Sequence, residues 1–193
     1  MNVRAKMRVV RWGLPGPPCG GPMPDLAEHF VSDSRSFLTE FYMPRVERCV
    51  ARLTNEQLWS RSNEASNSIG NLLLHMTGST RYWAAEAIGG TPIVRVRQQE
   101  FDRRDPISSH ALLAGLREAV SDADRRLAEL AGEKLLETRN VNGRQLTVLW
   151  CVYHIIEHFA MHTGQILSMT KALVGEPLPA DNAPTTGASK SNR

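Results

Sequence analysis

The sequence predicts an all-α protein, a four-helix bundle flanked by disordered N- and C-terminal arms. Four segments carry apolar residues every three or four positions, as amphipathic helices do. No stretch alternates apolar and polar residues for long enough to support a sheet. The chain has 193 residues, 41% of them hydrophobic and 22% charged, which is typical of one globular domain.

The two arms are predicted from composition. Residues 1–24 are basic and end in GLPGPPCGGPMP, which is too rich in glycine and proline to hold a helix or a strand. Residues 175–193 have a similar composition, so the bundle is expected within residues 25–174. Met23 offers a second start for the domain, and whether residues 1–22 are translated is a question for mass spectrometry of the native N-terminus.

The first two helices are expected over about residues 34–53 and 68–88. Pro44 lies inside the first and predicts a kink or a break, because proline has no backbone N–H to donate. Asn67 or Ser68 is the expected N-cap of the second helix, and a glycine pair followed by proline ends it.

The last two helices are expected over about residues 108–130 and from about Thr147 to Val174. A pair of serines supplies the N-cap of the third helix. The turn Asn142-Gly143 precedes the fourth helix, and Gly175 stops it.

Charge and hydropathy exclude two classes of partner. The formal net charge is +3, but residues 1–24 hold four of the 23 basic side chains and no acid. The remainder has 19 basic and 20 acidic side chains, a net charge of −1, so there is no basic excess for binding nucleic acid. No run of about 18 apolar residues is present, so no membrane span is expected.

The three cysteines indicate a reducing compartment. Their number is odd and they form no CxxC pair, which argues against a disulfide framework. The N-terminal arm also lacks the apolar stretch of a secretory signal. A cytoplasmic location is therefore expected.

Three histidines on the fourth helix are the main candidate for chemistry. His154, His158 and His162 are each four residues apart. On a helical wheel His162 lies at the edge of the apolar stripe, His158 beside it, and His154 further toward solvent. Residues one turn apart are about 6 Å from each other, so His158 and His162 can share one metal ion, whereas His154 and His162 are about 12 Å apart.

A third ligand is expected from a facing helix. His75 lies in an otherwise apolar turn of the second helix, and Ser79, Tyr82 and Glu86 follow it on the same flank as a polar strip that could line a cleft. Three imidazoles leave coordination positions open for water or substrate, as catalytic metal sites do. Such ligands suit zinc, nickel, copper or iron.

Other interpretations of these residues stay open. An HxxxH pair also occurs by chance, and histidines beside a core are often only hydrogen-bonded. Residues 154–158 also spell HxxEH, the inverted zinc-peptidase pattern, but Glu157 points away from the apolar stripe. Cys151 is interpreted as a reduced cysteine of the core.

Arg95 and Arg97 lie in the long connection between the second and third helices. They are either solvated charges or side chains that reach over the mouth of the bundle and bind an anionic group of a substrate.

Two stretches resemble the DinB/YfiT-like superfamily of four-helix bundles, in a branch known only as a domain of unknown function. They are NSIGNLLLHM (residues 67–76) and HIIEHFAMHTGQI (residues 154–166), and the similarity covers roughly residues 30–174. The resemblance implies one divalent metal held by His75, His158 and His162. His154 would then lie in the second shell or in the pocket. Relatives often have an acid where this chain has Val96.

The resemblance also implies a function, because members of the superfamily include thiol-dependent transferases. The leading hypothesis is a metal-dependent enzyme of the thiol S-transferase type, with zinc, nickel or iron as the metal. Its two substrates would be a small molecule and a low-molecular-weight thiol. The alternatives are a metal-dependent hydrolase and a non-catalytic bundle that binds metal or forms a homodimer. The expected pocket residues are His154, Ser79, Glu86, Arg95 and Arg97, and no catalytic residue is assigned. The metal-dependent hypotheses require the ring of His75 to lie within about 10 Å of the rings of His158 and His162, because ligand bonds to a shared metal are only about 2 Å long.

Overall fold

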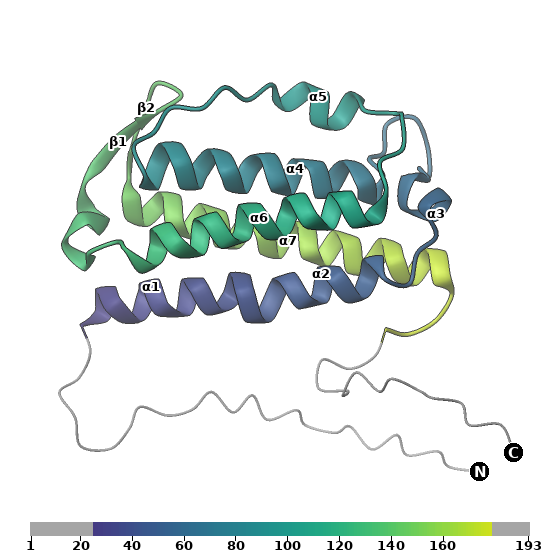
Figure 1. Ribbon diagram of the computed structural model, residues 1–193, viewed down its shortest axis with the longest axis horizontal. Helices are drawn as coiled ribbons and strands as arrows, with labels where there is room; N and C mark the ends of the chain where they lie inside the picture. Colours follow the sequence, from purple (N-terminus) through teal and green to yellow (C-terminus); the bar gives the residue numbers. More distant parts are fainter. Residues whose placement is uncertain (1–24, 179–193) are drawn as a thin grey trace, which may run out of the picture.

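The computed structural model describes residues 25–178, which form a bundle of long helices (Figure 1). The elements in chain order are α1 (Leu26–Ser36), the π-helical turn η1 (Phe37–Tyr42), α2 (Met43–Val50), α3 (Asn55–Trp59), α4 (Ile69–Tyr82), the π-helical turn η2 (Trp83–Ile88), α5 (Arg97–Asp102), α6 (Ser109–Ala128), the 3-10 turn η3 (Gly132–Leu136), β1 (Thr138–Val141), β2 (Arg144–Thr147) and α7 (Val148–Val174).

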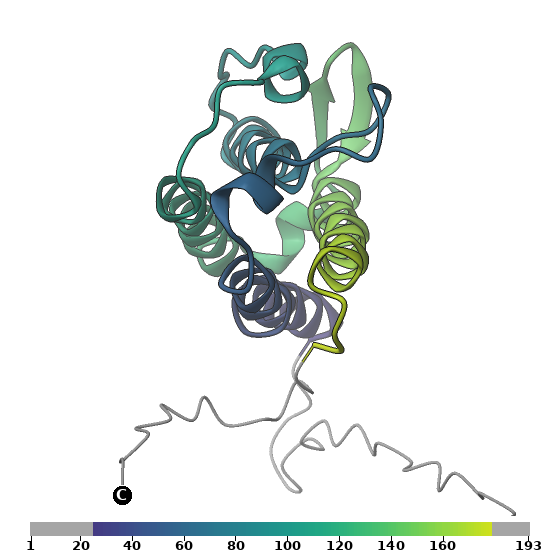
Figure 2. The ribbon, with the colours of Figure 1, turned by 90° about the vertical axis from the view of Figure 1, so that its right-hand side faces the viewer.

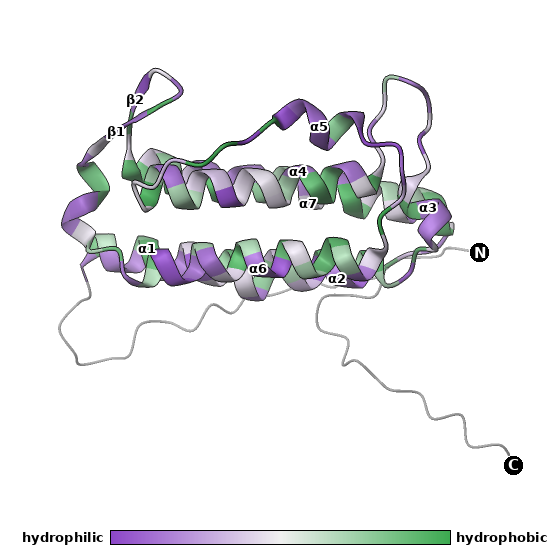
Figure 3. Cartoon of the chain, turned by 45° about the horizontal axis from the view of Figure 1, so that its top comes forward, coloured by the Kyte–Doolittle hydropathy of each residue, from purple (hydrophilic) through white to green (hydrophobic). Residues whose placement is uncertain are grey.

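Four rods build the bundle within the described residues. They are α1 continued by η1 and α2, α4 continued by η2, α6, and α7. Seen end-on, they surround a shared interior (Figure 2). Hydrophobic and hydrophilic residues are interspersed along the rods (Figure 3), and the buried apolar residues of the rods form a shared core, as a bundle of amphipathic helices requires. The prediction of an all-α four-helix bundle is confirmed.

The first rod begins earlier than predicted and ends slightly sooner. It starts at Leu26 and ends at Val50, whereas the sequence pattern placed it at residues 34–53. Asp25 is the N-cap, and Val31 in the added turns is buried in the core. Burial of this apolar position against the bundle extends the helix, and that contact is not visible in the local sequence.

Pro44 does not break the first rod. The turn before it winds as a π-helix, in which the N–H of Met43 donates to the carbonyl of Leu38, five residues back. Proline cannot donate to the carbonyl of Glu40, so the helix loses one bond at this place. The wider turn absorbs the irregularity and the rod continues.

The prediction that no strands form is wrong at one place. β1 and β2 pair as an antiparallel hairpin, with Thr138 opposite Thr147 and Val141 opposite Arg144. The predicted turn Asn142-Gly143 joins them, and both of its residues have positive φ, 52° and 78°, as a tight hairpin turn requires. Strands of four residues are too short for alternation to reveal them.

The helices that carry the candidate ligands have the predicted ends. Ser68 caps α4 and forms a capping box with Asn71. Thr147 caps α7 by accepting from the N–H of Trp150, and Gly175 ends α7 with a left-handed φ of 70°. The apolar stripe predicted for α7 is buried, including Val152, Ile155, Phe159 and Ile166.

The predicted arms fall mostly outside the described residues, which exclude residues 1–24 and 179–193. Residues 175–178 are described and contact the bundle. Glu176 pairs with Arg52 at 2.6 Å, and Leu178 packs against the core. Between residues 25 and 178, no helix is both long and apolar enough to cross a membrane.

Candidate metal centre

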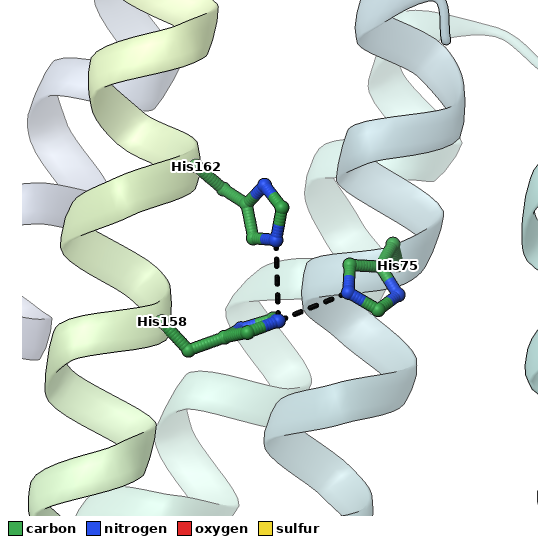
Figure 4. A group of neighbouring side chains, drawn as sticks. All are labelled: His75, His158 and His162. Atoms are coloured by element: carbon green, nitrogen blue, oxygen red, sulfur yellow. Dashed lines mark hydrogen bonds between the residues drawn. The ribbon is translucent and has the colours of Figure 1, made fainter. Parts of the chain in front are cut away.

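Three histidine rings meet between α4 and α7. Nε2 of His158 lies 2.9 Å from Nε2 of His75 and 3.1 Å from Nε2 of His162 (Figure 4). The ring centroid of His75 is 4.9 Å from that of His158 and 5.0 Å from that of His162. This is well within the limit of about 10 Å that the metal hypothesis requires. The sequence-predicted ligands are therefore brought together.

Each of the two helices supplies the histidine rings that the sequence analysis assigned to it. On α7 the four-residue spacing places His158 and His162 on successive turns of one face. His75 comes from α4 and is 4% exposed, and His162 is 7% exposed. Of the histidines, cysteines and acids in the described range, this trio offers three ligand atoms that all lie within 4.8 Å of one another.

The outer nitrogens of two rings are held by acceptors. Nδ1 of His75 lies 2.8 Å from Oε2 of Glu100, and Nδ1 of His162 lies 2.7 Å from Oε1 of Gln165. Because a carboxylate and an amide oxygen accept, each Nδ1 donates its hydrogen, and each Nε2 presents a lone pair to the centre. This arrangement, in which an acceptor orients a histidine whose other nitrogen binds metal, is usual around metal ions.

The donor set fits a divalent cation. Both His75 and His162 direct a lone pair at Nε2 of His158, which carries at most one hydrogen, so at least one lone pair has no hydrogen to accept. Ligand nitrogens about 2.05 Å from one metal, at angles between octahedral and tetrahedral, lie roughly 2.9–3.3 Å apart. The two separations in the structure, 2.9 and 3.1 Å, fall in this range.

Burial keeps the α7 ligands neutral. Burial, together with the neighbouring rings of His162 and His75, lowers the pKa of His158 to about 3. Burial also lowers the pKa of His162, against the opposing effect of its bond to Gln165. Neutral imidazole is the form that binds metal, so both rings are ready to act as ligands near neutral pH.

Glu100 is the site residue that sequence reasoning missed. It lies on α5, and its side chain is 13% exposed. Burial by itself raises its pKa, but hydrogen bonds from His75 and Arg95 outweigh burial and leave the pKa below its ordinary value. A charged residue 25 positions from His75 gives no periodic signal. The one sequence feature that could have indicated Glu100 is that this acid follows Arg95 and Arg97 in the connection between the second and third predicted helices.

Arg95 and Arg97 lie near the three rings and have different surroundings. Nε and one terminal nitrogen of Arg95 bind the two oxygens of Glu100 at 2.7 and 2.8 Å, so its guanidinium is engaged by the protein. Arg97 is exposed, and its guanidinium carbon lies 4.7 Å from the ring centre of Phe101. The Phe101 ring lies 4.6 Å from that of His75.

His154 lies beside the centre and not in it. Its ring stacks on Trp150 with centroids 5.1 Å apart, meets the edge of Trp83, and is 5.5 Å from the ring of His158. Its Nδ1 pairs with Glu157, which is exposed, so the acid of the HxxEH pattern faces outward.

Ser79 and Glu86 continue from His75 along the same rod. Ser79 is 3% exposed, and Glu86 lies near the hydroxyl of Tyr82, whose pKa is raised by burial and by that carboxylate. In the described structure no hydrogen bond joins the side chain of Ser79 or Glu86 to the three ligand rings.

The cysteines of the described range do not supply a nucleophile. Cys49 and Cys151 are free and buried. Burial raises the pKa of both thiols, that of Cys151 to about 11. A thiolate is the reactive form, so neither side chain is activated.

The family follows from a comparison with family models. The model described as mycothiol-S-transferase matches residues 35–169, which is more than half of the chain. The chain belongs to the mycothiol-S-transferase family. The matched range includes His75, Glu100, His158 and His162, so the whole centre lies within the part shared with this family. No curated protein matches the chain significantly.

Solved structures share the fold of this family member. A DinB-like protein from Bacillus subtilis is 16% identical, with a TM-score of 0.58 over 79% of this chain and 97% of that one. A DinB-like protein from Bacillus cereus is 16% identical, with a TM-score of 0.61 over 78% and 94%. A conserved protein from Enterococcus faecalis is 13% identical, with a TM-score of 0.60 over 81% and 100%. At these identities the likeness establishes the DinB-like fold alone.

Proposed function

We propose that this protein is a metal-dependent thiol S-transferase. His75, His158 and His162 hold one divalent cation, and a low-molecular-weight thiol is the cosubstrate. The observation that carries the proposal is the convergence of three Nε2 atoms within 4.8 Å, in a chain of the mycothiol-S-transferase family. Imidazole ligands suit zinc, nickel and iron.

The reaction transfers sulfur to an electrophilic carbon of a small molecule. A carbon–sulfur bond forms, the leaving group departs with the electron pair of the broken bond, and the thiol proton goes to the leaving group or to water. A bound divalent cation supplies a positive charge that lowers the pKa of the thiol and holds the thiolate.

The protein's own residues prepare the site for this chemistry. Glu100 and Gln165 fix the rings of His75 and His162 with Nε2 toward the centre. Because Arg97 is exposed beside Phe101, we assign it to an anionic group of the substrate or thiol. His154, Ser79, Glu86 and Arg95 complete the proposed surroundings of the pocket.

The sulfur comes from outside the chain in this proposal. The two described cysteines are buried with raised thiol pKa values, which favours an external thiol as the nucleophile. We place the reaction in the cytoplasm, where small thiols are kept reduced.

The test measures thiol conjugation. Protein reconstituted with zinc, nickel or iron is incubated with mycothiol and a fluorogenic bimane electrophile, and conjugate formation is followed over time. His158→Ala is expected to lose turnover, whereas His110→Ala, which changes an exposed histidine of α6, is expected to keep it. Equal rates for wild type and His158→Ala would count against the proposal.

A parallel assay separates transfer from hydrolysis. The same metal-loaded protein is given an activated ester without thiol. Hydrolysis that needs His158, together with no thiol conjugation, would favour the hydrolase alternative.

A further inference from the structure

One face of α4 is covered by the segment that carries Glu100. Asn71, His75 and Gly78 are spaced four and three residues apart, so they share this face. Residues 95–103, here named the strap, lie over it and include the short helix α5 (Figure 1). All three residues of α4 contact the strap, each in a different way.

Asn71 holds the backbone of the strap. Its side-chain nitrogen lies 2.9, 3.3 and 3.1 Å from the carbonyl oxygens of Glu100, Phe101 and Arg103. The last carbonyls of a helix lack partners within it, and the two N–H hydrogens of the buried Asn71 amide are shared among these three oxygens. Asn71 is fully buried, so no water competes for these bonds. Arg61 adds a bond to the carbonyl of Phe101 at 3.2 Å.

Gly78 allows the carboxylate of the strap to approach α4. A Cβ atom at this position would lie 2.1 Å from Oε1 of Glu100 and 3.2 Å from Nε of Arg95. Only a hydrogen fits there. The atom that would have to move is the far end of the flexible Glu100 side chain, so a methyl group would displace the carboxylate without forcing the backbone apart.

Displacement of that carboxylate would free the ring of His75. Glu100 accepts from Nδ1 of His75 at 2.8 Å, and Arg95 fixes its two oxygens. A shift of about 1 Å exceeds the range of a good hydrogen bond. The ring would then lose the partner that sets its tautomer and orientation.

We propose that the strap positions the imidazole of His75 for metal binding, and that Asn71 and Gly78 are the positioning residues that seat the strap. This inference rests on the proposed function for the presence of the metal. Beyond the proposed function, the inference states that packing between α5 and α4, and not the three ligands alone, sets the affinity for the metal.

The experiment compares two glycine variants in helix interiors. Gly78→Ala and Gly115→Ala each replace a helical glycine by alanine, so both gain helix propensity. A Cβ at Gly115 would meet only Cγ2 of Thr77, at 3.8 Å, which is ordinary contact. Zinc affinity is measured by competition with a chromogenic chelator, and the absorption spectrum of bound Co²⁺ reports the ligand geometry.

Gly78→Ala is expected to bind zinc about 10- to 100-fold more weakly, the usual effect of losing an outer-shell partner. Its Co²⁺ spectrum should change, while Gly115→Ala matches wild type in both measurements. In a protein that already carries Glu100→Ala, adding Gly78→Ala should not lower the zinc affinity further, because no carboxylate remains to be displaced.

Asn71→Asp provides a second, isosteric variant. It keeps an oxygen for Ser68 and Arg61 but turns an acceptor toward the three strap carbonyls. Hydrogen exchange of the amides of residues 97–102 should become faster, and zinc affinity should fall at least tenfold.

The outcomes separate the two proposals. If wild type binds zinc and Gly78→Ala binds it equally well, the strap proposal is overturned and the metal-dependent function stands. The strap proposal is also overturned if Gly78→Ala lowers zinc affinity by the same factor in the wild-type protein and in the Glu100→Ala variant. A wild-type protein that binds no metal overturns both.

Discussion

The three candidate ligands could be identified from the sequence because their signal is local. His158 and His162 share a face through helical spacing alone, and His75 stood out in an apolar turn. Glu100 and Gln165 had to wait for the structure. The role of Glu100 depends on α5 folding back over α4, whereas Gln165 lies three residues after His162 on the same helix and bonds its ring from there.

His75→Ala tests the ligand set at the level of one residue. We expect the variant to lose the stoichiometric metal of the wild type, because two histidines of one helix remain without a third ligand. Elemental analysis of purified protein measures this, with His110→Ala as the control. Retained metal in His75→Ala would exclude the proposed centre.

The described cysteines are expected to be inert. Cys49 and Cys151 should resist iodoacetamide at pH 8 in the folded protein, since burial raises both thiol pKa values. Mass spectrometry of peptides before and after denaturation measures the labelling. Cys151→Ala should keep transferase activity, whereas a loss of turnover without a loss of folding would indicate a protein nucleophile.

Among the elements, α7 was predicted best because both of its ends carry strong capping signals. Thr147 and Gly175 define its 27 residues. The first rod was predicted less well, since its early turns depend on burial of Val31 against other rods. The hairpin was missed for a similar reason, because its four-residue strands gain stability from their attachment to the bundle.

Two substitutions on α7 should have opposite effects on stability. Gly175→Ala is expected to lower the free energy of unfolding by about 1 kcal/mol, because alanine is strained at a φ of 70°. Gly164→Ala should raise it by up to about 1 kcal/mol, because its Cβ meets nothing and alanine favours the helix. Chemical denaturation measures both. Equal signs would contradict the assignment of Gly175 as the cap.

For the whole molecule, metal binding should stabilise the fold, since the ligands come from two rods that only the folded bundle brings together. Metal at 100 times its dissociation constant adds about 2.7 kcal/mol, which corresponds to a rise in Tm of roughly 5–11 °C for a protein of this size. Differential scanning fluorimetry with and without chelator measures the shift. His158→Ala should show none, and an equal shift in that variant would place the metal elsewhere.

Homodimer formation remains a prediction. Of the large aromatic side chains that could serve an interface, Trp59, Trp83 and Trp150 are half-buried within the protomer. Size-exclusion chromatography with light scattering measures the mass. A monomer at micromolar concentration would remove the dimer hypothesis and leave the metal centre intact.

From the sequence alone came the bundle, the ends of its capped helices and the three histidines proposed as ligands. These features depend on periodicity, capping and spacing, which act over a few residues. Only the folded chain shows that Glu100 holds the outer nitrogen of His75, that Arg95 binds Glu100, and that a glycine one turn beyond His75 makes room for the carboxylate. The contacts of Glu100 with His75 and Gly78 join segments distant in sequence that meet only once the apolar faces are buried, so no local pattern could show them.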